Sequence, residues 1–481
     1  MSPLGVLLLI SVYFLLIVLI AYLTTRGQAD SNFTFFRANR KAPWTAVAFG
    51  MIGASLSGVT FISVPGWVKT TGWTYMQMVM GYLAGYGVIA FVLLPIYYKL
   101  NLISIYTYLE KRFGNITYLT GASFFILSRL IGASFRLFLV AKVLQMFLFE
   151  ELQIPFVWNV IGTVILIWLY TFRGGIQTVL WTDVFQTIFM LLSVIITIYL
   201  VTKQLSIDWN EIPSWIAQSK YSFMLVWDWT SKQFFVKQFL GGMFIAIAMT
   251  GLDQDMMQKN LTCKTLQDAQ RNMITFSVSL LPVNILFLSL GVVLWHYHDS
   301  LGLSLQGDEL FPFLAKHHLG TFAAIVFLIG VIAAAYSSAD SALTALTTSF
   351  YIDILKIEKK YLSTNQKLIF RKVIHVGFSL AMMMIIIGFE KFGNKTVIEA
   401  IFKAASYTYG PLLGIFSFGI FTSYSLREPF VPLVAFIAPI LCFVLEQKAP
   451  AWLAGYTLGV ELLIINGLLT FLGLWIIKSR T

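Results

Sequence analysis

Charged side chains are scarce in this chain. Asp, Glu, Lys and Arg make up 11% of its 481 residues, whereas 58% of the residues are hydrophobic. A soluble domain carries roughly 25% charged residues, so the composition argues against a water-soluble globular protein. Apolar runs of about twenty residues, the length that crosses a bilayer as a helix, recur along the whole chain. We therefore predict an all-α polytopic membrane protein that is surrounded by lipid.

Cysteine is equally rare, and acidic residues are fewer than basic ones. The two cysteines, Cys263 and Cys442, are far apart and lie in or beside apolar runs, so neither a disulfide framework nor a cysteine metal site is indicated. Four of the five histidines lie within residues 296–318, but they lack the spacing of a metal site. The net charge of +11 comes from Lys and Arg in short loops between apolar runs, so we expect no nucleic-acid partner.

The hydropathy pattern predicts about thirteen membrane helices in one transmembrane domain that covers residues 1–481. The first run is too long for the apolar region of a signal peptide, and we expect it to be retained. With an odd number of spans the two termini lie on opposite sides of the membrane. The distribution of Lys and Arg among the loops places the N-terminus outside and the C-terminus in the cytoplasm. We expect the protein in a cell inner membrane. The predicted spans lie near residues 4–24, 46–69, 74–98, 117–149, 156–172, 180–202, 234–258, 272–296, 320–352, 369–388, 396–424, 430–446 and 452–477.

Two of these spans are predicted to be interrupted. The span at 46–69 contains "GMIGASLSGVTFISVPG", and the span at 234–258 contains "GGMFIAIAMTGLDQDMMQ". Glycine and small polar residues weaken a helix and free backbone carbonyls. Because the two spans cross the membrane in opposite directions, we interpret them as corresponding broken helices of an inverted repeat, which meet at the midplane and form a substrate and ion site. The alternative is that the glycines only permit close helix packing.

The span at 117–149 carries two arginines, Arg129 and Arg136, seven residues apart and hence on one helix face. A charge within a membrane span needs a partner or a watery cavity. Arg136 is the deeper of the two. It either binds an anionic substrate or forms a structural ion pair with an aspartate, and the sequence leaves both alternatives open.

The span at 320–352 contains "AAAYSSADSALTALTTSF". Ser337, Ser341, Thr344 and Thr348 follow a helical spacing and form one hydroxyl stripe, and Asp340 lies about 60° to one side of it. A monovalent cation needs several oxygen ligands, which this stripe and the carbonyls of a broken helix could supply together. The alternative is that the hydroxyls bond back to the preceding helical turn.

Five stretches resemble the sodium:solute symporter family, which includes the sodium–glucose, proline, iodide and sialic acid symporters. "FRGGIQTVLWTDVFQ", residues 172–186, is similar to the family's Gly-Gly…Trp-Thr-Asp-x-x-Gln pattern. The other stretches occur in the family's order and, with the first, cover most of the chain. They are "FRANRKAPWTAVAFGMIGASLSGVTFISVPG", "TYLEKRFG", "GLDQDMMQKNLTCKTLQDA" and "SSADSALTALTTSFYIDIL".

This resemblance implies a LeuT-type fold with a 5+5 inverted repeat, residues 46–202 and 234–424. Residues 4–24 would form an extra N-terminal helix, and residues 430–477 would form two extra C-terminal helices. It also implies a main sodium site, with sodium as the coupling ion and no organic cofactor. The ligands of that site would match Gly53, Leu56, Ala334, Ser337 and Ser338.

A second cation site occurs in some members of the family and uses the aspartate of the Trp-Thr-Asp motif. Here that residue is Asp183, and the other ligands would match Asp340 and Ser341. Those relatives usually carry a hydroxyl where this chain has Asp340. We consider three partners for the Asp340 carboxylate: a second sodium shared with Asp183, a proton, or Arg136.

The substrate positions of the family are matched by residues near the two interruptions and on the neighbouring spans. The resemblance therefore predicts a sodium-coupled secondary active symporter, not an enzyme, that imports a small polar solute such as a sugar, a sialic acid, an amino acid or a carboxylate. The alternatives are a proton-coupled transporter and a membrane sensor with a transporter fold. The candidate substrate-binding residues are Ser57, Thr60, Gln77, Arg136, Asp253 and Gln254.

Overall fold

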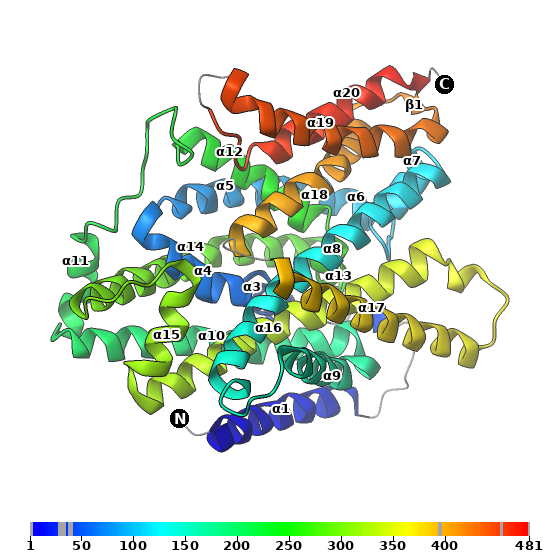
Figure 1. Cartoon of the computed structure of the whole chain (residues 1–481). Coiled ribbons are helices and arrows are strands. Elements are labelled where there is room, and N and C mark those ends of the chain that lie inside the picture. Colours follow the sequence, from blue (N-terminus) through cyan, green and yellow to red (C-terminus); the bar gives the residue numbers. More distant parts are fainter. Residues whose placement is uncertain (1–2, 27–34, 37–41, 393–396, 453–455, 480–481) are drawn as a thin grey trace.

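The computed structural model describes residues 3–26, 35–36, 42–392, 397–452 and 456–479, and nearly all of them lie in helices (Figure 1). Residues 37–41, part of one stretch that resembles the symporter family, lie outside these ranges. The helices of twelve or more residues are α1 Pro3–Thr25, α3 Trp44–Ser55, α4 Gly58–Thr71, α5 Tyr75–Val88, α8 Asn115–Leu144, α9 Phe156–Gly174, α10 Ile176–Gln204, α12 Phe235–Ala246, α14 Leu266–Ser300, α16 Gly320–Ser349, α17 Thr364–Phe392, α18 Val397–Phe421, α19 Val431–Trp452 and α20 Leu462–Ile476.

Shorter elements extend or connect these helices. The short α-helices are α6 Leu94–Lys99, α7 Thr107–Arg112, α11 Ile212–Ala217, α13 Gln254–Asn260 and α15 Leu310–His317. The π-helical turns are η2 Ile89–Leu93, η3 Gln145–Phe149, η5 Ile247–Gly251 and η7 Phe350–Ile354, and the 3-10 turns are η4 Trp209–Glu211, η6 Gly307–Glu309, η8 Ile357–Lys359 and η9 Glu428–Phe430. Strands β1 Ser425–Leu426 and β2 Lys478–Ser479 form one antiparallel pair near the C-terminus.

Eight helical segments in the described part of the chain are long and apolar enough to cross a membrane, and two bent helix pairs raise the number to ten. The shorter apolar helices Phe156–Thr171 and Leu462–Ile476 fall below that length. The structure therefore confirms an all-helical protein with many membrane-spanning segments. The figure of thirteen spans stays a prediction.

The bent pairs are α3 with α4, at 57°, and the segment Phe235–Gly251 with α13, at 70°. They coincide with the two spans that we predicted to be interrupted. In the first pair, Leu56 and Ser57 adopt extended backbone between the two helices. In the second pair, Asp253 is extended, and its side chain accepts hydrogen bonds from the backbone N–H groups of Asp255 and Met256. An aspartate that caps the start of a helix in this way satisfies backbone N–H groups, which lowers the free-energy cost of a helix break in the membrane interior.

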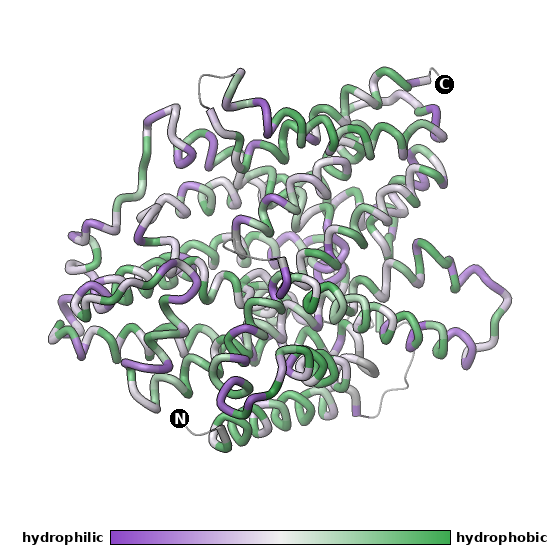
Figure 2. Tube along the Cα trace, viewed as in Figure 1, coloured by the Kyte–Doolittle hydropathy of each residue, from purple (hydrophilic) through white to green (hydrophobic). Residues whose placement is uncertain are grey.

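Burial separates the centre of the bundle from its lipid-facing rim. In the most hydrophobic stretch of the α16 segment, 83% of the residues are buried inside the protein. In the corresponding stretches of α1 and α19, 22% of the residues are buried. Figure 2 shows hydrophobic colour along most of α1, and purple concentrated in connections such as the one between η7 and α17. Since α1 and α19 expose Leu, Ile and Phe side chains, their outer faces suit contact with lipid tails.

Close approach of α5 and α12 depends on glycine. A methyl group added at Gly81 would lie 2.0 Å from the carbonyl oxygen of Phe239, and one added at Gly242 would lie 2.2 Å from that of Met78. Real Cβ atoms do not come so near a backbone oxygen, so the two helices pack backbone to backbone at these positions. This contact ties the helix after the first bend to the helix before the second.

We expect Gly81→Ala to lower the stability of the protein by about 1–3 kcal/mol, because the added methyl forces α5 away from α12. The matched control is Gly87→Ala on the same helix, where a methyl group meets nothing within 4 Å. Thermal unfolding of the detergent-purified variants checks the difference. Equal melting temperatures for the two variants would show that this backbone contact does not hold the helices together.

Candidate functional site

A small cavity lies between the first bend and the helical segment that precedes the second bend. Its lining combines residues of the first bend with residues of α5, α8 and the segment before α13. Because these elements are far apart in sequence, only the folded bundle brings them together. The lining residues used below are Ser57, Thr60, Tyr75, Tyr82, Tyr86, Arg129, Arg136, Thr250 and Phe402.

Three of the six predicted substrate residues line this cavity: Ser57, Thr60 and Arg136. The guanidinium of Arg136 has no ion pair or hydrogen bond to any other described residue. An unpaired cation beside two hydroxyl-bearing residues is suited to an anionic group. Nothing in the described contacts joins Arg136 to Asp340.

The other three predicted substrate residues lie outside the cavity lining, and their polar groups bond elsewhere. The side chain of Gln77 donates to the carbonyl oxygen of Gln233 at 2.8 Å and accepts from the N–H of Val226 at 3.1 Å. Gln254 bonds in the same two-sided way to the backbone of Ile103 and Ile105, at 3.0 Å each. Both glutamines therefore fasten connecting segments to the bundle in this conformation.

Asp253 belongs instead to a buried charge cluster. Arg129 forms a short ion pair with Asp255 and lies 3.8 Å from Asp253, and the hydroxyl of Tyr409 donates to Asp253. All four side chains are almost completely buried. The aspartates of the second bend thus both lie beside Arg129, whereas Arg136, seven residues further along α8, lines the cavity and forms no ion pair with a described residue.

Sequence reasoning missed the aromatic part of the lining. Tyr75, Tyr82 and Tyr86 project into the cavity from α5, and Phe402 comes from α18. The signal was present: the three tyrosines are spaced by seven and four residues, which places them on one face of a helix. A second cavity shares Tyr75 and Phe402 and extends along Trp67, Lys232 and Glu399, so the site continues toward the predicted external segments.

The predicted main sodium ligands come from the first bend and from α16. A methyl group added at Gly53 would lie 3.3 Å from the hydroxyl oxygen of Ser337, so the end of α3 and the middle of α16 are in close contact. Leu56, Ala334 and Ser338 are also buried. The hydroxyl of Ser338 has no hydrogen-bond partner among the described residues. The structure brings the five residues to one region but does not test their role as ligands.

The residues of the predicted second cation site also converge. Ser337 and Ser341 donate to the carboxylate of Asp183, at 2.5 Å and 3.5 Å. Asp340 accepts from the hydroxyl of Tyr170 at 2.9 Å and from the N–H of Ser341 at 2.5 Å.

A group that the sequence did not reveal lies among them. The ammonium of Lys259, on α13, is 2.6 Å from an oxygen of Asp183. Lys259 is the first residue after the predicted span 234–258, where a lysine reads as an interfacial anchor. Its complete burial follows from the bend, which turns α13 back into the bundle.

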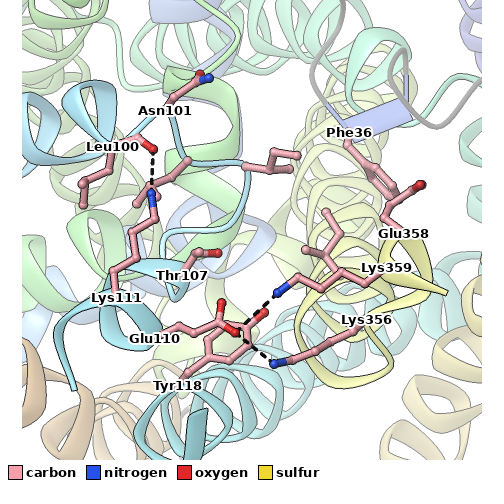
Figure 3. A pocket seen from close by; sticks show the side chains of 13 residues that line it. Phe36, Leu100, Asn101, Thr107, Glu110, Lys111, Tyr118, Lys356, Glu358 and Lys359 are labelled. Carbon is pink, nitrogen blue, oxygen red and sulfur yellow. Dashed lines mark hydrogen bonds and ion pairs between the residues drawn. The ribbon is translucent and has the colours of Figure 1, made fainter. Parts of the chain in front are cut away.

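A separate cavity lies at the other end of the molecule, between the segment after α6 and the segment around η7 and η8 (Figure 3). Glu110 forms ion pairs there with Lys356 at 3.1 Å and Lys359 at 3.5 Å. Burial alone would raise the pKa of Glu110, but hydrogen bonds and charge from the two lysines hold this pKa below its usual value. These contacts connect α7 to the end of the α16 segment.

Comparison with known proteins agrees with this architecture. The family model "Sodium:solute symporter family" matches residues 35–426. A sodium/sialic acid symporter of Aliivibrio fischeri is 25% identical over 476 residues, which is 97% of this chain and 91% of the relative. A sodium/sialic acid symporter of Proteus mirabilis is 24% identical and covers 80% of this chain and 79% of its own.

Solved structures with the same fold include a substrate-bound, outward-open sodium-coupled sialic acid symporter. It superimposes with a TM-score of 0.81 and 20% identity and covers 99% of both chains. Mhp1, a nucleobase-cation-symport-1 family transporter, superimposes with a TM-score of 0.54 and 14% identity and covers 93% of this chain and 94% of its own.

We expect Arg129→Met to destabilise the protein by about 3–5 kcal/mol, because the change leaves buried aspartates without their counter-charge. Lys220→Met is the control: Lys220 pairs with Asp299 at 3.6 Å, but its side chain is 67% exposed, so its loss should change the stability little. Urea or thermal unfolding of the purified variants measures both. If the two variants lose equally little stability, the buried cluster is not an ion pair on which the fold depends.

Proposed function

The chain belongs to the sodium:solute symporter family, and from this premise we propose that it is a sodium-coupled secondary active symporter for a small solute that carries a carboxylate. The observation that carries the choice of solute is Arg136, whose guanidinium faces the cavity between the two bends without an acidic partner. The protein binds and moves its substrate and catalyses no covalent reaction. Sodium is cargo as well as coupling ion.

The proposed architecture is two inverted repeats, residues 46–202 and 234–424, with residues 4–24 and 430–477 as additions in one transmembrane domain. The two bent pairs support it, because each is the first span of its repeat. If each bent pair counts as one span, and α9, α18 and α20 are added to the eight long segments, the bundle has thirteen spans. Broken helices at matching positions of the two halves are typical of transporters with such repeats.

The proposed substrate site consists of Arg136, Ser57 and Thr60 in the lining of the cavity. A guanidinium can donate two parallel hydrogen bonds to one carboxylate, and the two hydroxyls can bond to further oxygens of the solute. Gln77, Asp253 and Gln254 stay predictions as substrate contacts, because each is bonded to other groups in this conformation.

Several relatives support an anionic solute. Their names describe transport of sialic acid, iodide and monocarboxylates, all of which are negatively charged. The aromatic side chains of Tyr75, Tyr82, Tyr86 and Phe402 provide apolar faces and hydroxyls for the remainder of the solute. A sugar acid fits this combination better than a neutral sugar does, because a neutral sugar leaves Arg136 uncompensated.

The proposed sodium site uses the Gly53, Leu56 and Ala334 backbone carbonyls with the Ser337 and Ser338 hydroxyls. Support comes from the bend, where α3 ends at Ser55 and the following backbone is extended, and from the unpaired hydroxyl of Ser338. One sodium ion that moves down a potential of about 100 mV releases roughly 2.3 kcal/mol, enough for about fiftyfold accumulation of a neutral solute. With a singly charged carboxylate the transported pair carries no net charge, so its accumulation depends on the sodium concentration gradient.

Alternating access requires a closed side and an open side. The cavity continues toward the predicted external segments. On the other side Tyr106 and Tyr97 donate to the carbonyl oxygens of Leu252 and Gly251, at 2.8 Å and 2.9 Å. We propose that these bonds and the Arg129 cluster close the cytoplasmic path and break when the protein opens inward.

The proposed location is the cell inner membrane, with the N-terminus outside and the C-terminus in the cytoplasm. In Figure 1 the N-terminus lies toward the left of the view, as α11 does. The C-terminus lies toward the right, as the connection between η7 and α17 does. That connection is rich in lysine, which supports a cytoplasmic position for it.

Arg136→Gln should weaken binding of the carboxylate solute roughly 10- to 150-fold, the loss of about 1.5–3 kcal/mol for a hydrogen bond to a charged group. Lys142→Gln removes an exposed cation from the same helix and serves as control. Thermal-shift titration in sodium with sialic acids, monocarboxylates, amino acids and sugars measures binding, since a ligand of the folded state raises its stability. A neutral sugar as the best ligand would overturn the anion proposal.

Ser338→Ala should raise the sodium concentration needed for half-maximal uptake roughly five- to thirtyfold, for a loss of about 1–2 kcal/mol. Ser63→Ala is the control, because the Ser63 hydroxyl is also buried without a described partner but lies away from the predicted ligands. Uptake into proteoliposomes at varied sodium measures the effect. Flux that persists without sodium would point to proton coupling, and unchanged sodium dependence in Ser338→Ala would remove this residue from the site.

A further inference from the structure

The ammonium of Lys259 occupies a position that a free cation would otherwise suit. Lys259 and Asp183 are both completely buried, and the ammonium is 2.6 Å from the Asp183 carboxylate. Lysine is almost never fully buried unless its charge is paired. The pair joins α13, which follows the second bend, to α10.

The surroundings of this ammonium are rich in oxygen. Ser337 donates to one oxygen of Asp183, and Ser341 shares the other oxygen with Lys259. Asp340 lies beside them and binds the backbone N–H of Ser341. Two carboxylates and two hydroxyls on α10 and α16 are the kind of oxygen set that a hard cation takes.

One further carboxylate, Asp340, lies beside the pair, and its oxygens already have hydrogen-bond partners among the described residues. The remaining carboxylate, Asp340, accepts hydrogen bonds from the hydroxyls of Tyr170 and Thr182, at 2.9 Å and 3.5 Å, and from the Ser341 backbone. A sodium ion bound to Asp183 in this conformation would lie next to the Lys259 ammonium. Like charges at such a separation repel strongly in a buried, low-dielectric site.

We propose that the Lys259 ammonium replaces the second coupling cation, so that the protein binds one sodium ion in each transport cycle. This inference rests on the proposed function. It revises the prediction of a second cation site at Asp183, Asp340 and Ser341: these residues lie close together, but a cation that belongs to the chain is paired with the Asp183 carboxylate. Lys259 is then the residue that determines the ratio of sodium to solute.

A built-in cation differs from a transported one in two ways. Because it is covalently attached, it adds no sodium to the stoichiometry and contributes no driving force. Because it sits on α13, it also ties that helix to α10 directly beside Ser337, a proposed sodium ligand. The Lys259 ammonium, which compensates the charge of Asp183, is therefore present before sodium binds.

The experiment counts radioactive sodium ions bound per purified protein chain, by scintillation proximity in detergent, and fits the Hill coefficient. The wild type should bind one ion with a coefficient of one. Lys259→Met exposes the Asp183 carboxylate and keeps the apolar part of the side chain, so this variant should bind two ions with a coefficient above one. Lys259→Gln is a second charge-free variant with the same expectation, and Lys259→Arg, which keeps the charge, should bind one.

The double variant Asp183→Asn/Lys259→Met tests whether a second ion depends on the free Asp183 carboxylate and not on the space left by the lysine. It removes both partners of the pair, so it should fold as stably as the wild type or better and bind one ion. A wild type that binds two ions overturns the inference and leaves sodium coupling intact. A Lys259→Met protein that is folded and binds one ion also overturns it. A wild type that binds no sodium contradicts the proposed function itself and the inference with it.

Discussion

Charge neutralisation of one short helix organises the centre of this protein. All seven residues of α13 are buried, and most are polar or charged. Inside a membrane each such group needs a partner, and the partners lie on different elements. Two of these contacts are ion pairs: Asp255 with Arg129 on α8, and Lys259 with Asp183 on α10. The others are hydrogen bonds: Gln254 with the segment after α6, Gln258 with Thr348 on α16, and Asn260 with Asn272 on α14. The second bend is therefore a junction at which helices from the whole chain meet.

The function that we propose follows from how this junction distributes charge. Asp253 and Asp255 both lie within ion-pair distance of Arg129, and neither forms an ion pair with Arg136. Arg136 consequently presents a guanidinium without an ion pair to the cavity. The first bend faces the same cavity with Ser57 and Thr60 and contributes no charge of its own. An anionic solute supplies the partner that the Arg136 guanidinium lacks among the described residues, which gives the carboxylate a structural reason to bind there.

The same junction separates the two sides of the transport path. Toward the predicted external segments the cavity continues along Trp67 and Lys232. Toward the other side the polar partners of α13 and the tyrosine bonds to Leu252 and Gly251 fill the space. These bonds are individually modest and numerous, so the closed side can open when substrate and sodium shift the balance between two arrangements. The glycine contact between α5 and α12 holds those two helices backbone to backbone.

The sequence by itself determined the class of fold, the two bent spans and the hydroxyl-bearing stretch of α16. These features depend on composition and local backbone preference: a run of apolar residues predicts a membrane helix wherever it occurs, and glycine with small polar residues weakens a helix locally. The sequence also selected Ser57, Thr60, Arg136 and the serines around Ser337 as site residues.

Only the tertiary structure decided which charges pair. Arg129 and Arg136 share one helix face, and nothing local indicates that Arg129 meets Asp255, 126 residues away, while Arg136 stays unpaired. Lys259 directly follows a predicted span, and nothing local indicates that the bend turns it inward to Asp183. Gln77 and Gln254, which stay predictions as substrate ligands, are hydrogen-bonded to backbone segments in this conformation. Helical periodicity specifies the face on which a side chain lies, whereas the group opposite that face is fixed only when the helices pack.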